Sequence, residues 1–188
     1  MKRKVFLLIV LVVVLVLSLA ASAFAVPVVR TYRTTLVELN GSGVTGTAEI
    51  TLLPLGMVKV KVEAFGLVPG KRHAQNIHGF RSGAPAMIPP PDTGAYSDGI
   101  TSLEEALAYT GRVLLELAPF VRANPSGFQQ FTRVYRGEDV KPLDLGDVSL
   151  SNRVIMIQGG YTPATYYGPA YDPTLPVAAG KIAGPFMK

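Results

Sequence analysis

The chain has 188 residues, contains no cysteine and only two histidines, and carries a formal charge of +5 at pH 7. The lack of cysteine excludes disulfides, thiolate metal sites and cysteine nucleophiles. Three of the 18 basic residues lie in the first four positions, so residues 26–188 hold 15 basic and 13 acidic groups. An excess this small does not predict binding to nucleic acid.

Residues 1–25 have the form of a secretory signal peptide. Basic residues at positions 2–4 precede an apolar run, and the sequence AFA at 23–25 places alanine at the two positions that signal peptidase selects. The alternative is an uncleaved anchor, since the apolar character continues to Val29 and about 20 such residues can span a bilayer. Either way, the remainder is expected to be secreted or held at the cell surface, with membrane contact only through a retained leader. Residues 26–188 have a length that suits one domain.

The exported part has the pattern of an all-β protein. Residues 58–63, VKVKVE, alternate apolar and charged side chains, which predicts a strand with one buried and one solvated face. The dipeptide NG at 40–41 predicts a hairpin turn, although Asn40-Gly41-Ser42 also has the form of a glycosylation sequon. The predicted strands occupy residues 28–39, 43–53, 58–63, 73–80, 112–117, 129–135, 153–158 and 178–183.

One short helix and two long loops complete the pattern. Thr or Ser at 101–102, with Glu at 104–105, forms a capping signal for a helix that ends before Gly111. The loops cover residues 81–99, rich in Pro and Gly, and 159–175, rich in Tyr, Gly and Pro. Many short strands around a single helix predict a β-sandwich.

Residues 66–79, GLVPGKRHAQNIHG, resemble the metal-binding strand of copper/zinc superoxide dismutases and of CHRD (chordin-type) secreted domains. In those proteins a Gly-Leu-x-Pro-Gly turn leads into a His-x-x-His-x-His cluster. Three later segments resemble the family in the same order: residues 98–104 its helix start, 154–159 its Val-Ile-Val-Ile-His-Gly strand, and 172–180 its Leu-Pro-Val-Ala-Cys-Gly terminus. The resemblance spans most of residues 35–183 and implies an all-β, Greek-key, dismutase-like sandwich.

The chain departs from the family at the metal ligands. Its first and last cluster histidines are retained as His73 and His78, and the loop at 81–99 contains no histidine. By resemblance, His78 is the copper-ligand position that remains, while His73 matches a position that dismutases use structurally. The replaced family positions hold Asn76, Gln158 and Ala179.

Two interpretations of these polar residues follow. The first is a reduced copper or zinc site, since such a site needs about three good protein ligands. It would use His78, His73 and a loop carboxylate such as Asp92 or Asp98. The second, which we favour, is a hydrogen-bonded cluster of Asn76, His78 and Gln158, because neutral amides bind copper and zinc poorly. No cofactor and no dismutase activity are expected in that case.

Tyrosines in the second long loop form another candidate site. Rigid amphipathic rings suit the recognition of a protein surface or a sugar, although they also suit packing over the end of the sandwich. The four rings belong to Tyr161, Tyr166, Tyr167 and Tyr171.

Three functions remain open at this point. The first is a non-catalytic exported domain with a structural, adhesion or binding role at the cell surface or in the extracellular matrix. The second is a copper- or zinc-binding protein with the reduced site. The third is an extracellular subunit that polymerises by strand exchange, with residues 26–35 as donor strand. The expected partners are envelope or matrix components, or further copies of the chain.

Overall fold

The computed structural model describes residues 29–90, 99–146, 148–162 and 169–187, together with Arg3 and Val5. Nearly all of the predicted leader lies outside the described residues. Among the residues described, no helix is long and apolar enough to cross a membrane.

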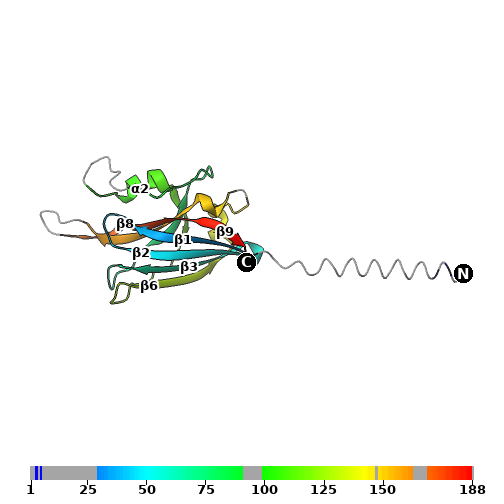
Figure 1. The fold of residues 1–188 in the computed structure, drawn as a ribbon, viewed down its shortest axis with the longest axis horizontal. Coiled ribbons are helices and arrows are strands. Elements are labelled where there is room, and N and C mark those ends of the chain that lie inside the picture. The colour runs from blue at the N-terminus through cyan, green and yellow to red at the C-terminus, as the bar shows by residue number, and fades with distance from the viewer. Residues whose placement is uncertain are drawn as a thin grey trace.

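Antiparallel strands form most of the described chain (Figure 1). Their order is β5-β4-β7-β8-β1-β2-β3-β6, and β9 pairs with β1. The strands are β1 Arg30–Glu38, β2 Thr45–Leu53, β3 Met57–Phe65, β4 Gln75–Gly79, β5 Arg112–Glu116, β6 Gln129–Tyr135, β7 Val154–Tyr161, β8 Tyr171–Lys181 and β9 Ala183–Met187. The α-helix α2 spans Leu103–Thr110, and short 3-10 turns lie at Pro54–Gly56, Gly137–Asp139, Lys141–Leu143 and Leu150–Asn152.

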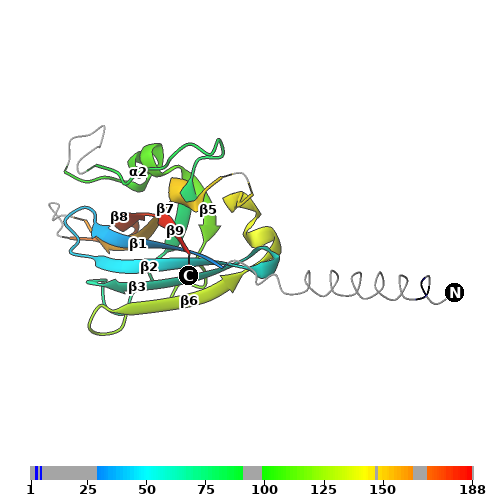
Figure 2. The ribbon, with the colours of Figure 1, turned by 45° about the vertical axis from the view of Figure 1, so that its right-hand side comes forward.

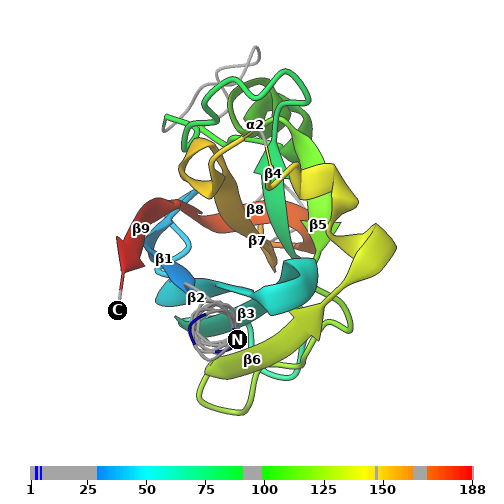
Figure 3. The same ribbon diagram turned by 90° about the vertical axis from the view of Figure 1, so that its right-hand side faces the viewer.

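The strands curl into two layers, which are seen end-on in Figure 3. The first sheet contains β9, β1, β2, β3 and β6, and the second contains β8, β7, β4 and β5. The chain passes between the layers from β3 to β4, from β5 to β6 and from β6 to β7. This is a Greek-key β-sandwich with a single described α-helix in a long connection, so the expected fold class is confirmed.

The alternating pattern predicted for residues 58–63 is confirmed in β3. Val58, Val60 and Val62 are almost fully buried, while Lys59 is exposed on the opposite face. The inward-facing side chains join those of β4 and β7, such as Ile77 and Ile155, in the main core between the sheets.

A second, smaller core lies on the far side of the second sheet. The helix α2 lies over this sheet, away from β2, β3 and β6 (Figures 2 and 3). Ala106 of α2 and Ala86 of the preceding loop pack with Val154 and Met156 of β7. Because both faces of the second sheet are covered, every residue of β4 is buried.

The predicted start and end of the helix are confirmed. Ser102 caps α2: its hydroxyl accepts from the backbone of Glu105, whose carboxylate accepts from the backbone of Ser102. Gly111 ends the helix at φ 73°, a conformation that favours glycine.

The C-terminal elements differ from the sequence-based expectation. Residues 159–175 are not one loop, because β7 continues to Tyr161 and β8 begins at Tyr171, where the two strands still pair. The predicted closing strand at 178–183 is the end of β8, and β9 was not predicted at all.

The donor-strand hypothesis also requires correction. The described part of residues 26–35 belongs to β1, which pairs with β2 along one edge and with β9 and β8 along the other. This segment is therefore an internal strand of its own sheet and is not a free strand for exchange.

Candidate functional site

Asn76 and His78 of β4 lie on the face of the second sheet that α2 covers. Asn76 pairs with Met156 and His78 with Val154, and both partners belong to the smaller core under α2. His78 is fully buried, and Asn76 is 5% exposed. This register places Asn76 and His78 on the same face of the sheet, as expected for residues two positions apart on a strand.

The side-chain amides of Asn76 and Gln158 contact each other. Asn76 Nδ2 donates to Gln158 Oε1 at 3.4 Å, across 82 residues of sequence. Gln158 sits near the end of β7 and is 6% exposed. This hydrogen bond partly offsets the cost of burying the two amides, and it does not involve His78, which bonds to Gly111 instead.

His78 has one engaged and one unengaged ring nitrogen. Nδ1 lies 3.1 Å from the carbonyl oxygen of Gly111, which requires the ring N–H to be on Nδ1. Nε2 is buried and has no hydrogen-bond partner among the described residues. Burial lowers the pKa of His78, and the Gly111 hydrogen bond opposes this only in part, so the ring is neutral at pH 7 with a lone pair on Nε2.

His73 lies just before β4, between the turn at Val68 and the end of β7. Its Nδ1 lies 3.2 Å from the carbonyl oxygen of Gln158, and its Nε2 lies 3.2 Å from that of Val68. The ring is fully buried. Both nitrogens face backbone oxygens, so in this structure neither is directed at a position where a metal ion could lie beside His78.

Two of the four candidate tyrosines lie within the described chain, and Tyr166 and Tyr167 lie outside it. The hydroxyl of Tyr171 donates to the carbonyl of Arg72 at 3.1 Å, and its ring meets the edge of His73 at 6.4 Å between centroids. Burial, and then the neighbouring Asp172 and Tyr161, raise the pKa of Tyr171. Tyr171 therefore packs over the His73 end of the sandwich, whereas Tyr161 is 54% exposed.

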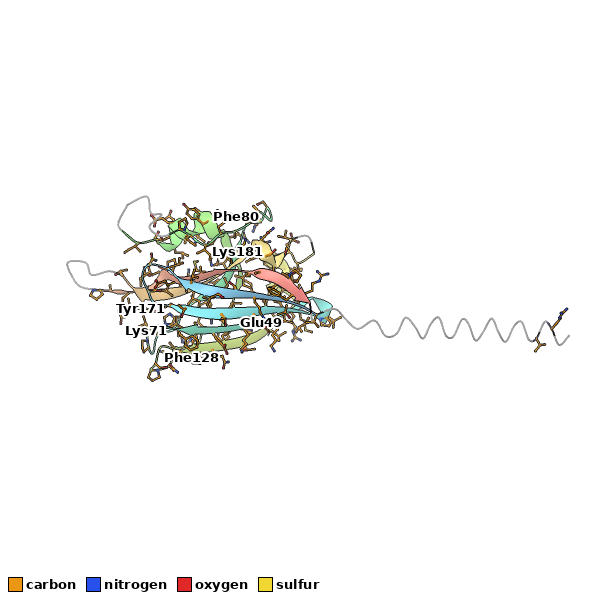
Figure 4. All side chains as sticks on the ribbon, in the orientation of Figure 1. Glu49, Lys71, Phe80, Phe128, Tyr171 and Lys181 are labelled. Atoms are coloured by element: carbon orange, nitrogen blue, oxygen red, sulfur yellow. The ribbon has the colours of Figure 1, made fainter. Side chains whose placement is uncertain are left out.

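Tyr161 and Tyr171 contact each other, and a lysine side chain lies beside them. Tyr161 and Tyr171 meet edge to face at 5.9 Å, and Lys71 Nζ lies 5.0 Å from the Tyr171 ring centre. Figure 4 shows Lys71 and Tyr171 at the same end of the molecule. The two candidate regions, which the sequence presented separately, thus meet at His73.

A buried arginine was missed by the sequence-based reasoning. Arg153 is 1% exposed, and it donates to the carbonyl oxygens of Phe80 at 3.0 Å and Leu143 at 3.4 Å. Burial lowers its pKa, and Asp144 opposes this. Arg153 joins the loop after β4 to the segment before β7, and an arginine next to an apolar run gives no signal of such a role.

The site as a whole offers few metal donors. Across the described residues, no group of three or more His, Cys, Asp or Glu side chains is placed to hold a metal ion. Asp92 and Asp98, the carboxylates considered from sequence, lie outside the described residues. The donors within reach are one imidazole nitrogen of His78 and the two amides, a set that suits hydrogen bonding better than copper or zinc.

No family model matches this sequence, and no curated protein matches it. Among solved structures, the chain is similar to the copper(II) form of superoxide dismutase 5 from Candida albicans, at 11% identity over 81% of this chain and 90% of that chain, with a TM-score of 0.44. Two single-residue variants of that enzyme are also similar. One is 12% identical over 84% of this chain and 90% of that chain, with a TM-score of 0.44. The other is 11% identical over 82% of this chain and 91% of that chain, with a TM-score of 0.42. Similarity at this level concerns the arrangement of the strands alone.

Proposed function

We propose that this protein is an exported, non-catalytic β-sandwich of CHRD type, with a structural, adhesion or binding role at the cell surface or in the extracellular matrix. In this proposal residues 1–25 direct export and residues 26–188 form the working domain. The leader pattern, the absence of cysteine and the motif at residues 66–79 support it.

The observation that carries the non-catalytic role is the contact between Asn76 and Gln158. These residues stand where the family places copper-binding histidines, and their amides bond to each other. Both ring nitrogens of His73 face backbone carbonyl oxygens, and a neutral ring donates to one of the two. The face that would hold a catalytic metal is therefore occupied by a polar cluster that stabilises the sandwich.

A second candidate function is a reduced copper or zinc site on His78. It is favoured by one observation: Nδ1 bonds to a backbone carbonyl, the arrangement typical of metal-bound histidines, while buried Nε2 has no partner in the described chain. A bound ion would act there as a Lewis acid or a redox centre. His78 alone is too few ligands, so loop carboxylates would have to join it.

Metal retention distinguishes these two functions. The protein, expressed from its full sequence, is loaded with copper(II) or zinc, dialysed, and analysed for bound metal beside His78→Ala. We expect substoichiometric metal in both. The double substitution Asn76→His with Gln158→His serves as a positive control, because it restores imidazoles to the family positions and should bind copper. Stoichiometric metal in the unaltered protein that is lost in His78→Ala contradicts the non-catalytic role.

Export has its own measurement. Mass spectrometry of the protein recovered from outside the expressing cell should show a chain that begins at Val26. Recovery of the intact chain in the membrane fraction would support the uncleaved anchor instead.

A further inference from the structure

The outer face of the first sheet contains two adjoining hollows. One has a volume of about 680 Å³ and the other about 550 Å³, and they share Thr35 and Thr47. These two threonines are direct cross-strand partners in β1 and β2, and both are exposed. The hollows therefore form one continuous groove across β1, β2 and β3, with paired hydroxyl groups at its centre.

Four charged side chains on the floor of this groove form two ion pairs. Arg33 Nε lies 3.0 Å from Glu49 Oε2, and Lys61 Nζ lies 3.0 Å from Glu63 Oε1. Gln130 also donates to Glu63 at 2.8 Å. The floor thus presents many donors and acceptors in fixed positions while its charges cancel.

Aromatic rings stand at both ends of the groove. Phe186 of β9, 50% exposed, lines the first hollow, and Phe65 of β3, 54% exposed, lines the second. The Phe65 ring is held by Phe128, with ring centres 4.9 Å apart. Each end of the groove therefore presents an exposed aromatic ring that is free to contact an apolar face of a ligand.

The loop after β4 forms one side of the first hollow. Ile88 lines the first hollow, and Lys181 of β8 donates through Nζ to the carbonyl of Ala86, which fixes the loop beside the groove. Figure 4 labels Lys181 and Glu49, which line the first hollow, and Phe128, which contacts Phe65.

We infer that this groove binds a neutral oligosaccharide. Hydroxyl-rich neutral ligands suit a lining that offers threonine hydroxyls and two ion pairs, and whose three cations are balanced by three carboxylates once Lys181 and Glu38 are included. The apolar faces of sugar rings suit exposed phenylalanines. A groove with an aromatic ring at each end suits an extended chain of sugars. This inference goes beyond the proposed function because it names a surface and a ligand class, and it does not depend on the residues around His78.

Binding of defined saccharides tests the inference. The protein expressed from its full sequence is titrated by calorimetry with cellohexaose, laminarihexaose, mannohexaose and chitohexaose, with oligogalacturonate as an acidic probe and an uncharged peptide of similar length. We expect binding of at least one neutral hexasaccharide. Phe186→Ala and Phe65→Ala should each weaken it by about five- to tenfold. Glu49→Gln should weaken it as well and keeps the test independent of any loss of folding at the aromatic positions.

Val113→Ala is the control, because it shortens an exposed apolar side chain on β5 of the second sheet that lines neither hollow. It should leave binding unchanged. Binding to none of the neutral sugars overturns the inference. So does stronger binding to oligogalacturonate or to the peptide, or loss of binding in Val113→Ala with no effect of the phenylalanine substitutions. The metal experiment can fail or succeed without altering any of these outcomes.

Discussion

The outer faces of the two sheets place their polar groups in different surroundings, one covered by other parts of the chain and the other open to solvent. On the second sheet, Asn76, His78 and Gln158 are buried beneath α2 and the loop after β4. On the first sheet, Arg33 and Glu49 form an ion pair with both side chains substantially exposed to solvent.

This difference indicates that the buried polar groups of the second sheet contribute to the fold, whereas the exposed polar groups of the first sheet can contact a ligand. A buried polar atom must find a partner or lower the stability, so the covered face tolerates little change. An exposed ion pair adds little stability because water competes for both partners. We therefore expect substitutions to alter stability on the covered face and ligand binding on the open face.

The largest effect is expected at Gly111, where the covering helix ends against β4. A Cβ atom here would lie 2.4 Å from the carbonyl carbon of Gly79, and the backbone has φ 73°. Gly111→Ala should lower the free energy of unfolding by about 3 kcal/mol or more, because the methyl group displaces backbone and because φ 73° with ψ −172° is a conformation that essentially only glycine adopts. Urea denaturation of the two proteins measures this loss in unfolding free energy.

Gly137→Ala is the control for that substitution. Its φ of 60° is similar, but nothing lies within 4 Å of the added Cβ. It should cost about 1 kcal/mol, the strain alone. Equal losses for the two variants would show that the covered face can shift to admit the methyl group.

An intermediate effect is expected from the protonation of His78. Burial holds its folded-state pKa below the unfolded value, so the unfolded state takes up a proton first as the pH falls below about 6.5. Stability present above that pH should be lost on acidification, by up to about 1.4 kcal/mol per pH unit more than in His78→Gln. Denaturation midpoints at several pH values between 5 and 7.5 give the two slopes, and parallel slopes would exclude this role for His78.

The smallest effect is expected on the open face. Glu49→Gln removes the ion pair with Arg33. In this pair the side chain of Arg33 is 58% exposed and that of Glu49 is 39% exposed. The loss in unfolding free energy should be below about 0.5 kcal/mol. Gln158→Ala, which removes the partner of Asn76 on the covered face, should cost about 1–2 kcal/mol in the same assay. A reversed order would refute the distinction between the faces.

Strands with one solvated face were predictable from sequence, and strands in other settings were less so. In β3 the alternation of valine with charged residues reports burial directly. The end of β7 is rich in Gly and the start of β8 contains Asp172 and Pro173, and these segments form strands because they pair with each other across the hairpin. β9 contains Gly184 and Pro185, which a single sequence presents as a turn, yet a proline is tolerated on an edge strand.

The candidate site depended on resemblance for a physical reason. Asn76 and Gln158 are 82 residues apart, and their contact follows from the register of β4 against β7, which no local pattern specifies. The engagement of both His73 nitrogens by carbonyls, and the burial of Arg153, depend on where turns place backbone oxygens. The groove on the first sheet was not anticipated, because its residues look like an ordinary solvated face until the curl of the sheet and β9 bring them together.

The predicted turn at residues 40–41 has a consequence for covalent modification. Asn40 Nδ2 donates to the carbonyl oxygens of Thr101 and Pro176, both at 2.9 Å, and Oδ1 accepts from the backbone of Thr101 at 2.7 Å. A glycan on this sequon would replace one of the two hydrogens on Nδ2 and fill the space where the chain before α2 docks. In a cell that glycosylates Asn-x-Ser, the transferase and the folding chain would therefore compete for the same nitrogen, and whichever acts first excludes the other.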